Sequence, residues 1–333
     1  MRLPGFDHFV PGTIREACDL LREHKEKAKV IAGGTDLLVR MKQKLLTPAF
    51  LVNLKGIPEF EYISEDPGGG LRIGALTRLR IIEGSSLIKD KFSLLAQAAG
   101  RVATLQIRNV ATVGGNLCLD SRCWYYNQSH FWRKSRPLCY KRGGDLCHVV
   151  KGGDRCYALC QADTAPVLMA LGARVKVMSF EGERVIALKD FFTGEGRGVN
   201  VLQPHEILTE IQVPFLPSFS GGVYLKDSAR DVIDFPILGV GVVLTLESGN
   251  GLCGEVKIVL GAVSSAPIEV GKAEKVLKGE KLTEGLIEEA ARVASKEVRP
   301  FTQMGIPASY KRRMVEVFTK QALREAWRLA RRS

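Results

Sequence analysis

The architecture of this chain can be inferred from one short segment, Lys29-Val-Ile-Ala-Gly-Gly-Thr-Asp36. Its apolar residues Val30 to Ala32 predict a strand that leads into a glycine pair, and residues 35–44 predict a helix after the turn. A glycine turn lets backbone N–H groups approach an anion closely, and a helix that begins there adds favourable partial charge. The segment therefore suggests a pyrophosphate cradle, with a plain tight turn as the alternative. It does not match G-x-G-x-x-G, so the Rossmann fingerprint is absent.

A second glycine pair lies farther along the chain, in the segment Ala111-Thr-Val-Gly-Gly-Asn116. It also follows a short extended stretch. Two such turns could hold a diphosphate from two sides, which is a more specific arrangement than one turn alone. Two unrelated structural turns remain the alternative explanation of the same residues.

Short helices and strands alternate around these glycine pairs. Thr13 and Glu16 form a T-x-x-E capping box that opens a helix reaching about His24. Further elements are predicted as strands at 49–53, 71–75 and 174–178 and a helix at 93–102. Prolines, serines and glycines crowd residues 214–222, which therefore mark the best domain boundary. Strands at 238–246 and 255–263 then precede helices that open at Thr283 and Ser309, as in a small α+β domain.

Composition limits the class of protein. The 333 residues are 45% hydrophobic and 25% charged, which is typical of a globular chain of two or three domains. No apolar run approaches the roughly 18 residues that a membrane-spanning helix needs. The opening residues MRLPGFDHFVPG lack the charged and apolar regions of a signal peptide. We therefore expect a cytoplasmic protein with no membrane span.

The net charge of +12 is concentrated in two segments. Residues 122–156 and residues 301–333 each hold eight Lys or Arg against two acidic residues, and the rest of the chain is balanced. The basic C-terminal helix fits a solvated face or contact with an acidic partner subunit. Aromatic residues are not interleaved with its basic ones to form a stacking surface, so we do not expect a nucleic-acid partner.

Six of the eight cysteines lie between Cys118 and Cys160. In a reducing compartment such a cluster suggests metal or redox chemistry more than disulfides. Four of the six stand in a basic, aromatic segment without any C-x-x-C pair: Cys123, Cys139, Cys147 and Cys156. The missing pair weakens a structural zinc site, and the basic residues would offset the net −2 of a [4Fe–4S] core on four thiolates. Zinc on four thiolates has the same charge, so iron–sulfur, zinc and merely structural cysteines all remain open.

Taken together, these segments resemble the FAD-binding subunit of the molybdenum hydroxylases, a family that includes carbon monoxide dehydrogenase, xanthine dehydrogenase and 4-hydroxybenzoyl-CoA reductase. The resemblance covers nearly the whole chain. The segments that carry it are the A-G-G-T-D loop, the T-x-G-G-N loop, Asp163-x-x-Pro166, I-L-x-x-I-x-V-P at 207–214, and the Y-K-R-R helix from Tyr310.

The resemblance implies an α+β fold. A two-subdomain FAD-binding domain of the PCMH/VAO-like type would span residues 1–216, with subdomains of about 1–55 and 56–216. A small α+β domain like the C-terminal domain of the carbon monoxide dehydrogenase flavoprotein would follow at 217–333. FAD would lie between the two subdomains. The resemblance implies that it contacts Lys29, Val30, Ile31, Ala32, Gly33, Gly34, Thr35, Asp36, Thr112, Val113, Gly114, Gly115, Asn116, Asp163, Leu208 and Lys226.

The cysteine-rich segment narrows the resemblance further. Most flavin subunits of this family lack it, whereas the 4-hydroxybenzoyl-CoA reductase β subunit is similar in the run Asn116 to Ser129 and in Trp132-Arg133-Lys134. This similarity implies an insertion at about 119–158 that binds an extra [4Fe–4S] cluster through Cys123, Cys139, Cys147 and Cys156. Cys118 and Cys160 lie outside that ligand pattern.

The function that the resemblance implies is electron transfer inside a molybdenum enzyme complex. Electrons from a donor such as ferredoxin would pass through the [4Fe–4S] cluster and FAD to a small [2Fe–2S] subunit and a molybdopterin-binding large subunit. The substrate would react on the large subunit, so no catalytic acid or base is expected here. One alternative is the FAD subunit of another molybdenum hydroxylase that uses NAD or a quinone. Another is a zinc-stabilised protein whose basic segments bind nucleic acid or an acidic partner.

Overall fold

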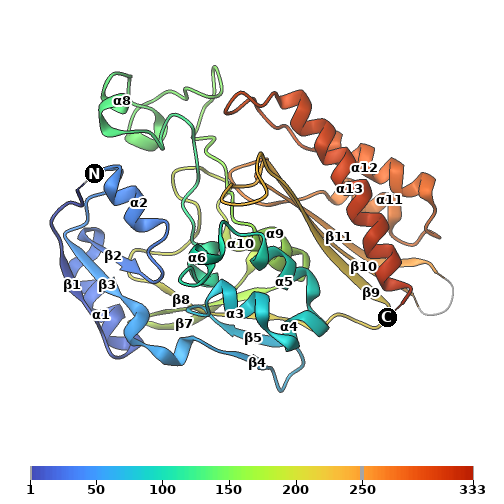
Figure 1. Cartoon of the computed structure of the whole chain (residues 1–333), viewed down its shortest axis with the longest axis horizontal. Helices are drawn as coiled ribbons and strands as arrows, with labels where there is room; N and C mark the ends of the chain where they lie inside the picture. Colours follow the sequence, from blue (N-terminus) through green and yellow to red (C-terminus); the bar gives the residue numbers. More distant parts are fainter. Residues whose placement is uncertain (1, 248–250, 333) are drawn as a thin grey trace.

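The computed structural model describes residues 2–247 and 251–332. Figure 1 shows three groups of elements side by side, coloured blue, teal to yellow, and orange to red along the chain. Within the described residues each group is built on its own sheet. The strand orders are β1-β3-β2, β4-β5-β8-β6-β7 and β12-β11-β10-β9. The chain therefore mixes helix and strand, as predicted.

The N-terminal group is a small parallel sheet with two helices. Its elements are β1 (Asp7–Phe9), α1 (Ile14–His24), a 3₁₀ turn (Lys25–Lys27), β2 (Ala28–Ile31), α2 (Leu37–Lys42) and β3 (Phe50–Asn53). Helix α1 begins where Thr13 Oγ1 accepts a hydrogen bond from the Glu16 N–H at 3.2 Å. The Glu16 carboxylate in turn accepts from the Gly12 N–H at 2.8 Å, one residue before the position that an ideal capping box uses. The predicted helix start is confirmed.

The middle group is an antiparallel sheet covered by short helices. Its strands are β4 (Ile63–Glu65), β5 (Leu71–Gly74), β6 (Arg174–Ser179), β7 (Gly182–Ala187) and β8 (Ile207–Val213). Its helices are α3 (Leu79–Gly84), α4 (Ser86–Lys91), α5 (Ser93–Gly100), α6 (Leu105–Arg108), α7 (Val113–Leu117), α9 (Thr164–Ala170) and α10 (Leu188–Phe191), with 3₁₀ turns at Leu54–Gly56 and Pro58–Phe60. Phe92 and Phe191 are fully buried in its hydrophobic core. Burial of such side chains is the main source of stability for a layer of this kind.

The C-terminal group packs three helices on one antiparallel sheet. Its elements are β9 (Ser220–Asp227), β10 (Leu238–Leu246), β11 (Cys253–Gly261), β12 (Ile268–Glu269), α11 (Gly271–Leu277), α12 (Glu284–Glu297) and α13 (Ala308–Ala330). Thr283 caps α12 by accepting from the Leu286 N–H at 3.3 Å, which confirms the predicted helix start.

The glycine pair Gly221-Gly222 does not belong to a linker, although its composition suggested one. Both glycines lie inside β9. A Cβ on Gly221 would stand 2.0 Å from the Ala326 carbonyl oxygen of α13, and one on Gly222 would touch Leu94 at 3.0 Å. These glycines therefore allow the strand to approach a helix on each side, a role that the sequence pattern cannot distinguish from a turn.

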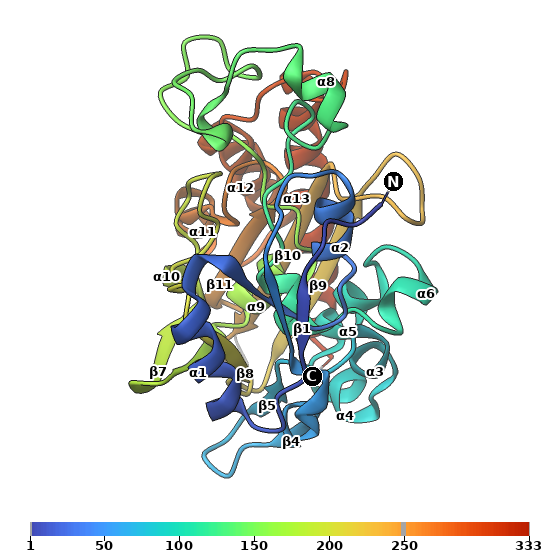
Figure 2. The ribbon, with the colours of Figure 1, turned by 90° about the vertical axis from the view of Figure 1, so that its left-hand side faces the viewer.

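The cysteine-rich segment projects from the body as a separate lobe. It contains α8 (His130–Lys134) and a 3₁₀ turn (Tyr140–Arg142), and Figures 1 and 2 both show it in green at the top of the molecule. The two ends of the lobe are joined by a β-bridge, in which Arg122 and Leu159 exchange two backbone hydrogen bonds of 2.8 Å. No helix of the described residues has the length and apolar character needed to cross a membrane.

Candidate functional site

The first glycine loop connects β2 to α2 and presses against the segment before the second loop. A Cβ on Gly33 would lie 2.1 Å from the Val110 carbonyl oxygen, so only glycine fits there. Gly34 has a φ of +72°, which L side chains rarely adopt. Within the part of the chain that the structure describes, the N–H groups of residues 33–36 donate no hydrogen bond to another residue. They are therefore available to an anionic ligand.

The second glycine loop forms the first turn of α7, and its own N–H groups are already used. Thr112 Oγ1 accepts from the Gly115 N–H at 3.1 Å, and the Gly114 N–H donates to the Ala75 carbonyl at 2.9 Å. A Cβ on Gly114 would lie 2.8 Å from Ala75. The second loop thus supplies a close-fitting wall beside the first loop. The structure places the two loops together, as a diphosphate held from two sides requires.

Asn116, at the end of the second loop, fastens it to α9. Its Oδ1 accepts from the Thr164 N–H at 3.2 Å and from the Thr164 hydroxyl at 2.6 Å. The neighbouring residue Asp163 therefore lies close to the second loop, as predicted from the sequence. Leu208 lies in the adjacent strand β8 and is 6% exposed.

Asp163 and Lys226 form a buried ion pair between the middle and C-terminal groups. Asp163 accepts from Lys226 Nζ at 3.1 Å and from the Tyr224 hydroxyl at 2.8 Å. Lys226 also donates to the carbonyls of Arg101 at 2.8 Å and Asp234 at 2.9 Å. Burial raises the pKa of Asp163 to about 6, although Lys226 and Tyr224 oppose that shift. The pair locks the two groups together beside the glycine loops.

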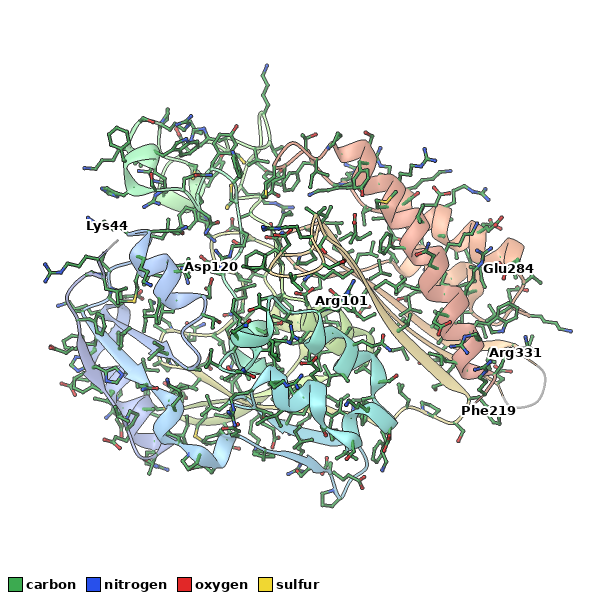
Figure 3. The ribbon with its side chains drawn as sticks, viewed as in Figure 1. Lys44, Arg101, Asp120, Phe219, Glu284 and Arg331 are labelled. Carbon is green, nitrogen blue, oxygen red and sulfur yellow. The ribbon has the colours of Figure 1, made fainter. Side chains whose placement is uncertain are left out.

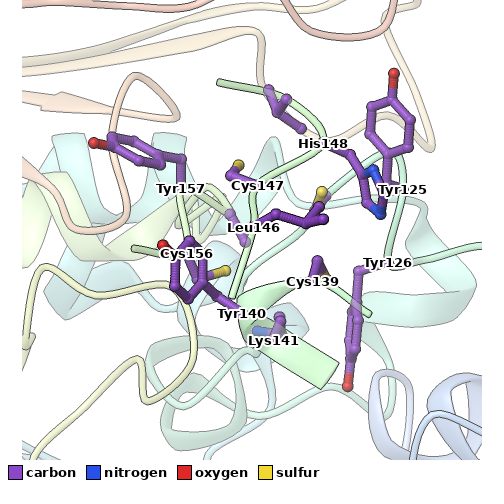
Figure 4. Close-up of a pocket in the computed structure, with 13 residues that line it drawn as sticks. Tyr125, Tyr126, Cys139, Tyr140, Lys141, Leu146, Cys147, His148, Cys156 and Tyr157 are labelled. Atoms are coloured by element: carbon purple, nitrogen blue, oxygen red, sulfur yellow. The ribbon is translucent and has the colours of Figure 1, made fainter. Parts of the chain in front are cut away.

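The four cysteines singled out in the sequence line one pocket of the projecting lobe: Cys123, Cys139, Cys147 and Cys156. Figure 4 shows three of them labelled around the pocket, with Tyr126 and Lys141 on its rim. All four are free thiols. Cys160 is instead buried in the core of the middle group, and Cys118 packs against that core.

Backbone N–H groups point at the sulfur atoms of this pocket. The Val150 N–H donates to Cys147 Sγ at 3.4 Å. Backbone hydrogen bonds from Tyr125 and Tyr126 lower the pKa of Cys123, and one from Ala158 lowers that of Cys156. Burial outweighs them and raises the pKa of Cys156 to about 11. The pKa of Cys123 is also raised by burial, so Cys123 and Cys156 must lose their protons before they can bind a metal as thiolates.

Single-ion metal sites and iron–sulfur clusters place different demands on their thiol ligands. Among the described residues, no group of three His, Cys, Asp or Glu side chains is arranged to hold one metal ion. Zinc needs four sulfur atoms at about 2.3 Å from a single ion. An iron–sulfur cube binds each thiolate through a different iron, so its ligands stand farther apart. The four thiols line one pocket, and backbone N–H groups donate to the sulfur atoms of three of them: Cys123, Cys147 and Cys156.

Sequence reasoning missed three residues that lie between the two sites. Arg40 follows the first loop, Asp120 precedes the cysteine lobe, and Lys141 lines the cysteine pocket. Their side chains form ion pairs across long separations in the chain. No local pattern marks such residues, since lysines, arginines and aspartates at these spacings usually form a solvated surface.

The comparisons with known proteins agree along the whole chain. The family described as "FAD binding domain in molybdopterin dehydrogenase" matches residues 4–216, and the "CO dehydrogenase flavoprotein C-terminal domain" matches residues 223–326. The carbon monoxide dehydrogenase medium chain of Afipia carboxidovorans is 29% identical, over 97% of this chain and 98% of its own length. An aldehyde oxidoreductase FAD-binding subunit of Escherichia coli is 30% identical, over 75% of this chain and 79% of its own length.

Solved structures give the same result. A crystal structure of a Cu,Mo-containing carbon monoxide dehydrogenase matches with a TM-score of 0.81 and 27% identity, covering 98% of this chain and 99% of that one. The predicted order of folds, a two-subdomain FAD-binding domain followed by a flavoprotein C-terminal domain, is confirmed. The chain belongs to the family of FAD-binding medium subunits of the molybdenum hydroxylases.

Proposed function

We propose that this chain is the electron-transfer subunit of a 4-hydroxybenzoyl-CoA reductase-like molybdenum enzyme, with FAD in its body and a [4Fe–4S] cluster in its projecting lobe. The observation that carries the proposal is the convergence of Cys123, Cys139, Cys147 and Cys156 on one pocket. A flavin subunit needs no such pocket for its own cofactor. FAD exchanges one or two electrons and an iron–sulfur cluster exchanges one, so the two together suit a junction between carriers.

The residues proposed to hold FAD fall into three groups, according to what they would contribute to the site. In the segment Lys29 to Asp36, the N–H groups of residues 33–36, which donate to no other described residue, are proposed to face the diphosphate. The second loop, Thr112 to Asn116, supplies the facing wall. Asp163, Leu208 and Lys226 are proposed to lie beside the flavin. The charges of Asp163 and Lys226 already neutralise each other. The first effect of the pair is therefore to hold the C-terminal group against the loops.

The cluster is proposed to be held by the four pocket cysteines. Residues 122–156 carry a large positive excess, which offsets the negative charge of four thiolates on a cluster. Burial raises the pKa of Cys156, and the charge of the Lys141 ammonium, which is 5% exposed, opposes that rise. Hydrogen bonds to the sulfur atoms and nearby cations both raise the potential at which a cluster accepts an electron. The surroundings of the pocket thus favour the reduced cluster.

The surface of the lobe supports an external protein donor. Phe131 is 87% exposed, and Leu138 and Trp124 are about half exposed on the same lobe. Lys134 is exposed next to Phe131. Exposed apolar side chains on a lobe with a basic excess fit an acidic redox protein such as a ferredoxin. We propose that donor, with a molybdopterin-binding large subunit and a small [2Fe–2S] subunit as permanent partners in a cytoplasmic heterotrimer that acts in anaerobic aromatic degradation.

We also propose the division of the chain into residues 1–216 and 217–333, with subdomains of about 1–55 and 56–216 and an insertion at about 119–158. The three sheets support this division, because each draws its strands from only one of these segments.

A second candidate is the FAD subunit of another molybdenum hydroxylase that uses NAD or a quinone. It is favoured by the names of the relatives, which include a nicotinate dehydrogenase FAD-subunit of Eubacterium barkeri at 28% identity, over 96% of this chain and 95% of its own length. Rapid oxidation of the bound flavin by NAD⁺ in the assembled complex supports this candidate. Rapid reduction of the flavin by ferredoxin, with no response to NAD⁺, supports the first.

The deciding experiment counts flavin, iron and acid-labile sulfide on the chain purified without air. One FAD with about four iron and four sulfide per chain is expected, as in a cluster held by four cysteines. Cys139→Ser should lose most of the iron and keep the flavin. Cys118→Ala, a change outside the pocket in the same part of the chain, is the matched control and should keep both. Flavin without iron, or zinc in place of iron, would overturn the cluster assignment and leave the flavoprotein family unchanged.

A further inference from the structure

An unbroken series of ion pairs connects the first glycine loop to the cysteine pocket. Asp36, at the end of the loop, pairs with Arg122 and also lies 3.7 Å from Arg40 Nη1. Arg40 Nη2 lies 2.9 Å from Asp120 Oδ2. Lys141 Nζ lies 2.8 Å from Asp120 Oδ1. Asp120 is therefore the anion between the two sites, and Figure 3 shows it below the green lobe and beside the blue N-terminal group.

The pocket end of this series is rigidly fixed. Lys141 also donates to Ser121 Oγ at 2.5 Å and to the Gly196 carbonyl at 2.6 Å. The Gly196 N–H donates to the Cys156 carbonyl at 3.0 Å, and a Cβ on Gly196 would lie 2.7 Å from Cys156 Sγ. Lys141 lies in the 3₁₀ turn Tyr140–Arg142, which Cys139 directly precedes. One ammonium group thus holds the backbone near two of the four pocket cysteines.

The series is buried enough for its geometry to matter. Its five side chains are between 5% and 21% exposed. Three cations share only two carboxylates, so loss of Asp36 leaves Arg122, and loss of Asp120 leaves Lys141, without an anionic partner in this series. A buried cation that loses its carboxylate is poorly solvated, so the side chains around it rearrange to give it a new partner. A change at one end of the series must therefore move the other end.

We propose that Asp120 is a positioning residue through which FAD at the first glycine loop orders the cysteine pocket. A diphosphate next to residues 33–36 fixes the loop and with it Asp36. Asp36 then fixes Arg40, Arg40 fixes Asp120, and Asp120 fixes Lys141 beside Cys139 and Cys156. Linkage requires the reverse effect as well, so an ordered pocket tightens FAD binding by the same factor. The inference rests on the proposed placement of FAD, but it does not require that the pocket hold a cluster.

The test measures how fast the pocket thiols react in the cluster-free chain. Alkylation by N-ethylmaleimide is followed peptide by peptide, with and without saturating FAD. In the wild type, FAD should slow the labelling of Cys139 and Cys156 by about fivefold or more, the lower end of typical coupling between sites. In Asp120→Asn this protection should fall below about twofold. Asp145→Asn, an exposed aspartate of the same lobe with no ion pair among the described residues, is the matched control and should keep full protection.

The pattern of labelling separates a positioning role from a merely structural one. A structural role would raise labelling equally with and without FAD, and that outcome overturns the proposal. Unchanged protection in Asp120→Asn also overturns it. If Asp120→Asn does not fold, Arg40→Gln breaks the series between Asp36 and Asp120 and should give the same loss of protection. Failure of the cluster assignment would appear separately, as a chain without iron whose thiols are still protected by FAD.

Discussion

The contact between the two glycine loops makes Gly33→Ala a sharp test of the FAD site. The new Cβ would lie 2.1 Å from the Val110 carbonyl oxygen and 2.8 Å from the Val110 carbonyl carbon. Ordinary contact begins near 3.4 Å, so the loops must separate by more than an ångström. Both atoms belong to backbone, which cannot move aside as a side chain can. The substitution therefore widens the space in which the diphosphate is proposed to lie.

Overpacking of this kind costs about 1–3 kcal/mol. If the strain is released by parting the loops, FAD loses that amount of binding free energy, and its dissociation constant rises by about 5- to 150-fold. Titration of the flavin-free chain with FAD, followed by the change in flavin fluorescence, measures the constant directly. The unfolding midpoint of the flavin-free variant, compared with that of the flavin-free wild type, shows how much the strain destabilises the protein when FAD is absent.

Gly84→Ala is the matched control for this substitution. Gly84 ends α3, and a Cβ there would meet no heavy atom within 4 Å. Its FAD affinity should be unchanged, with stability equal to the wild type or higher by up to about 1 kcal/mol. If Gly33→Ala binds FAD within about twofold of the wild type, the two loops do not hold the dinucleotide between them.

Two further predictions concern stability and local motion. Lys311 is buried without an ion pair among the described residues, and burial lowers its pKa from 10.5 to about 8. The folded chain therefore releases this proton at lower pH than the unfolded chain. Between about pH 8 and pH 10 the free energy of unfolding of the wild type should rise by up to about 3 kcal/mol relative to that of Lys311→Met. Urea unfolding of both proteins at both pH values measures this difference, and a difference that does not change with pH would refute the prediction. Arg133 donates to the carbonyls of Gln43 and Lys44 at 2.9 Å each and so ties the lobe to the end of α2. Arg133→Met should speed amide exchange within residues 124–155 by about tenfold or more while exchange in β10 stays unchanged, and equal exchange in both proteins would contradict this role.

Local signals in the sequence predicted much of the fold. The strand, glycine turn and helix of residues 29–44 appear in the structure as β2, the loop and α2. Strand β2 begins two residues before the predicted strand and ends one residue before it, and α2 is two residues shorter than predicted at each end. Thr13 and Thr283 cap their helices as predicted, because a capping hydroxyl acts on an N–H only two or three residues away. Such interactions depend on neighbours in the chain, so the sequence alone is enough to find them.

Interactions between distant segments could not be predicted in the same way. Gly221 resembles a turn residue in sequence, and only the packed helix α13 reveals why no side chain is tolerated there. The ion pairs of Asp120 join residues about 80 positions before it and 21 after it, with no periodicity to signal them. The cysteines were found because of their unusual density, whereas their convergence on one pocket is a property of the folded lobe.

The β-bridge between Arg122 and Leu159 brings together the two ends of the lobe where they join the body of the chain. Its two ends leave the body side by side, so a tight turn could replace everything between them without stretching any element of the three sheets. A chain trimmed in this way should still fold and keep its flavin loops. The same geometry would let a single insertion add the whole lobe to a flavoprotein without changing the order of strands in its three sheets.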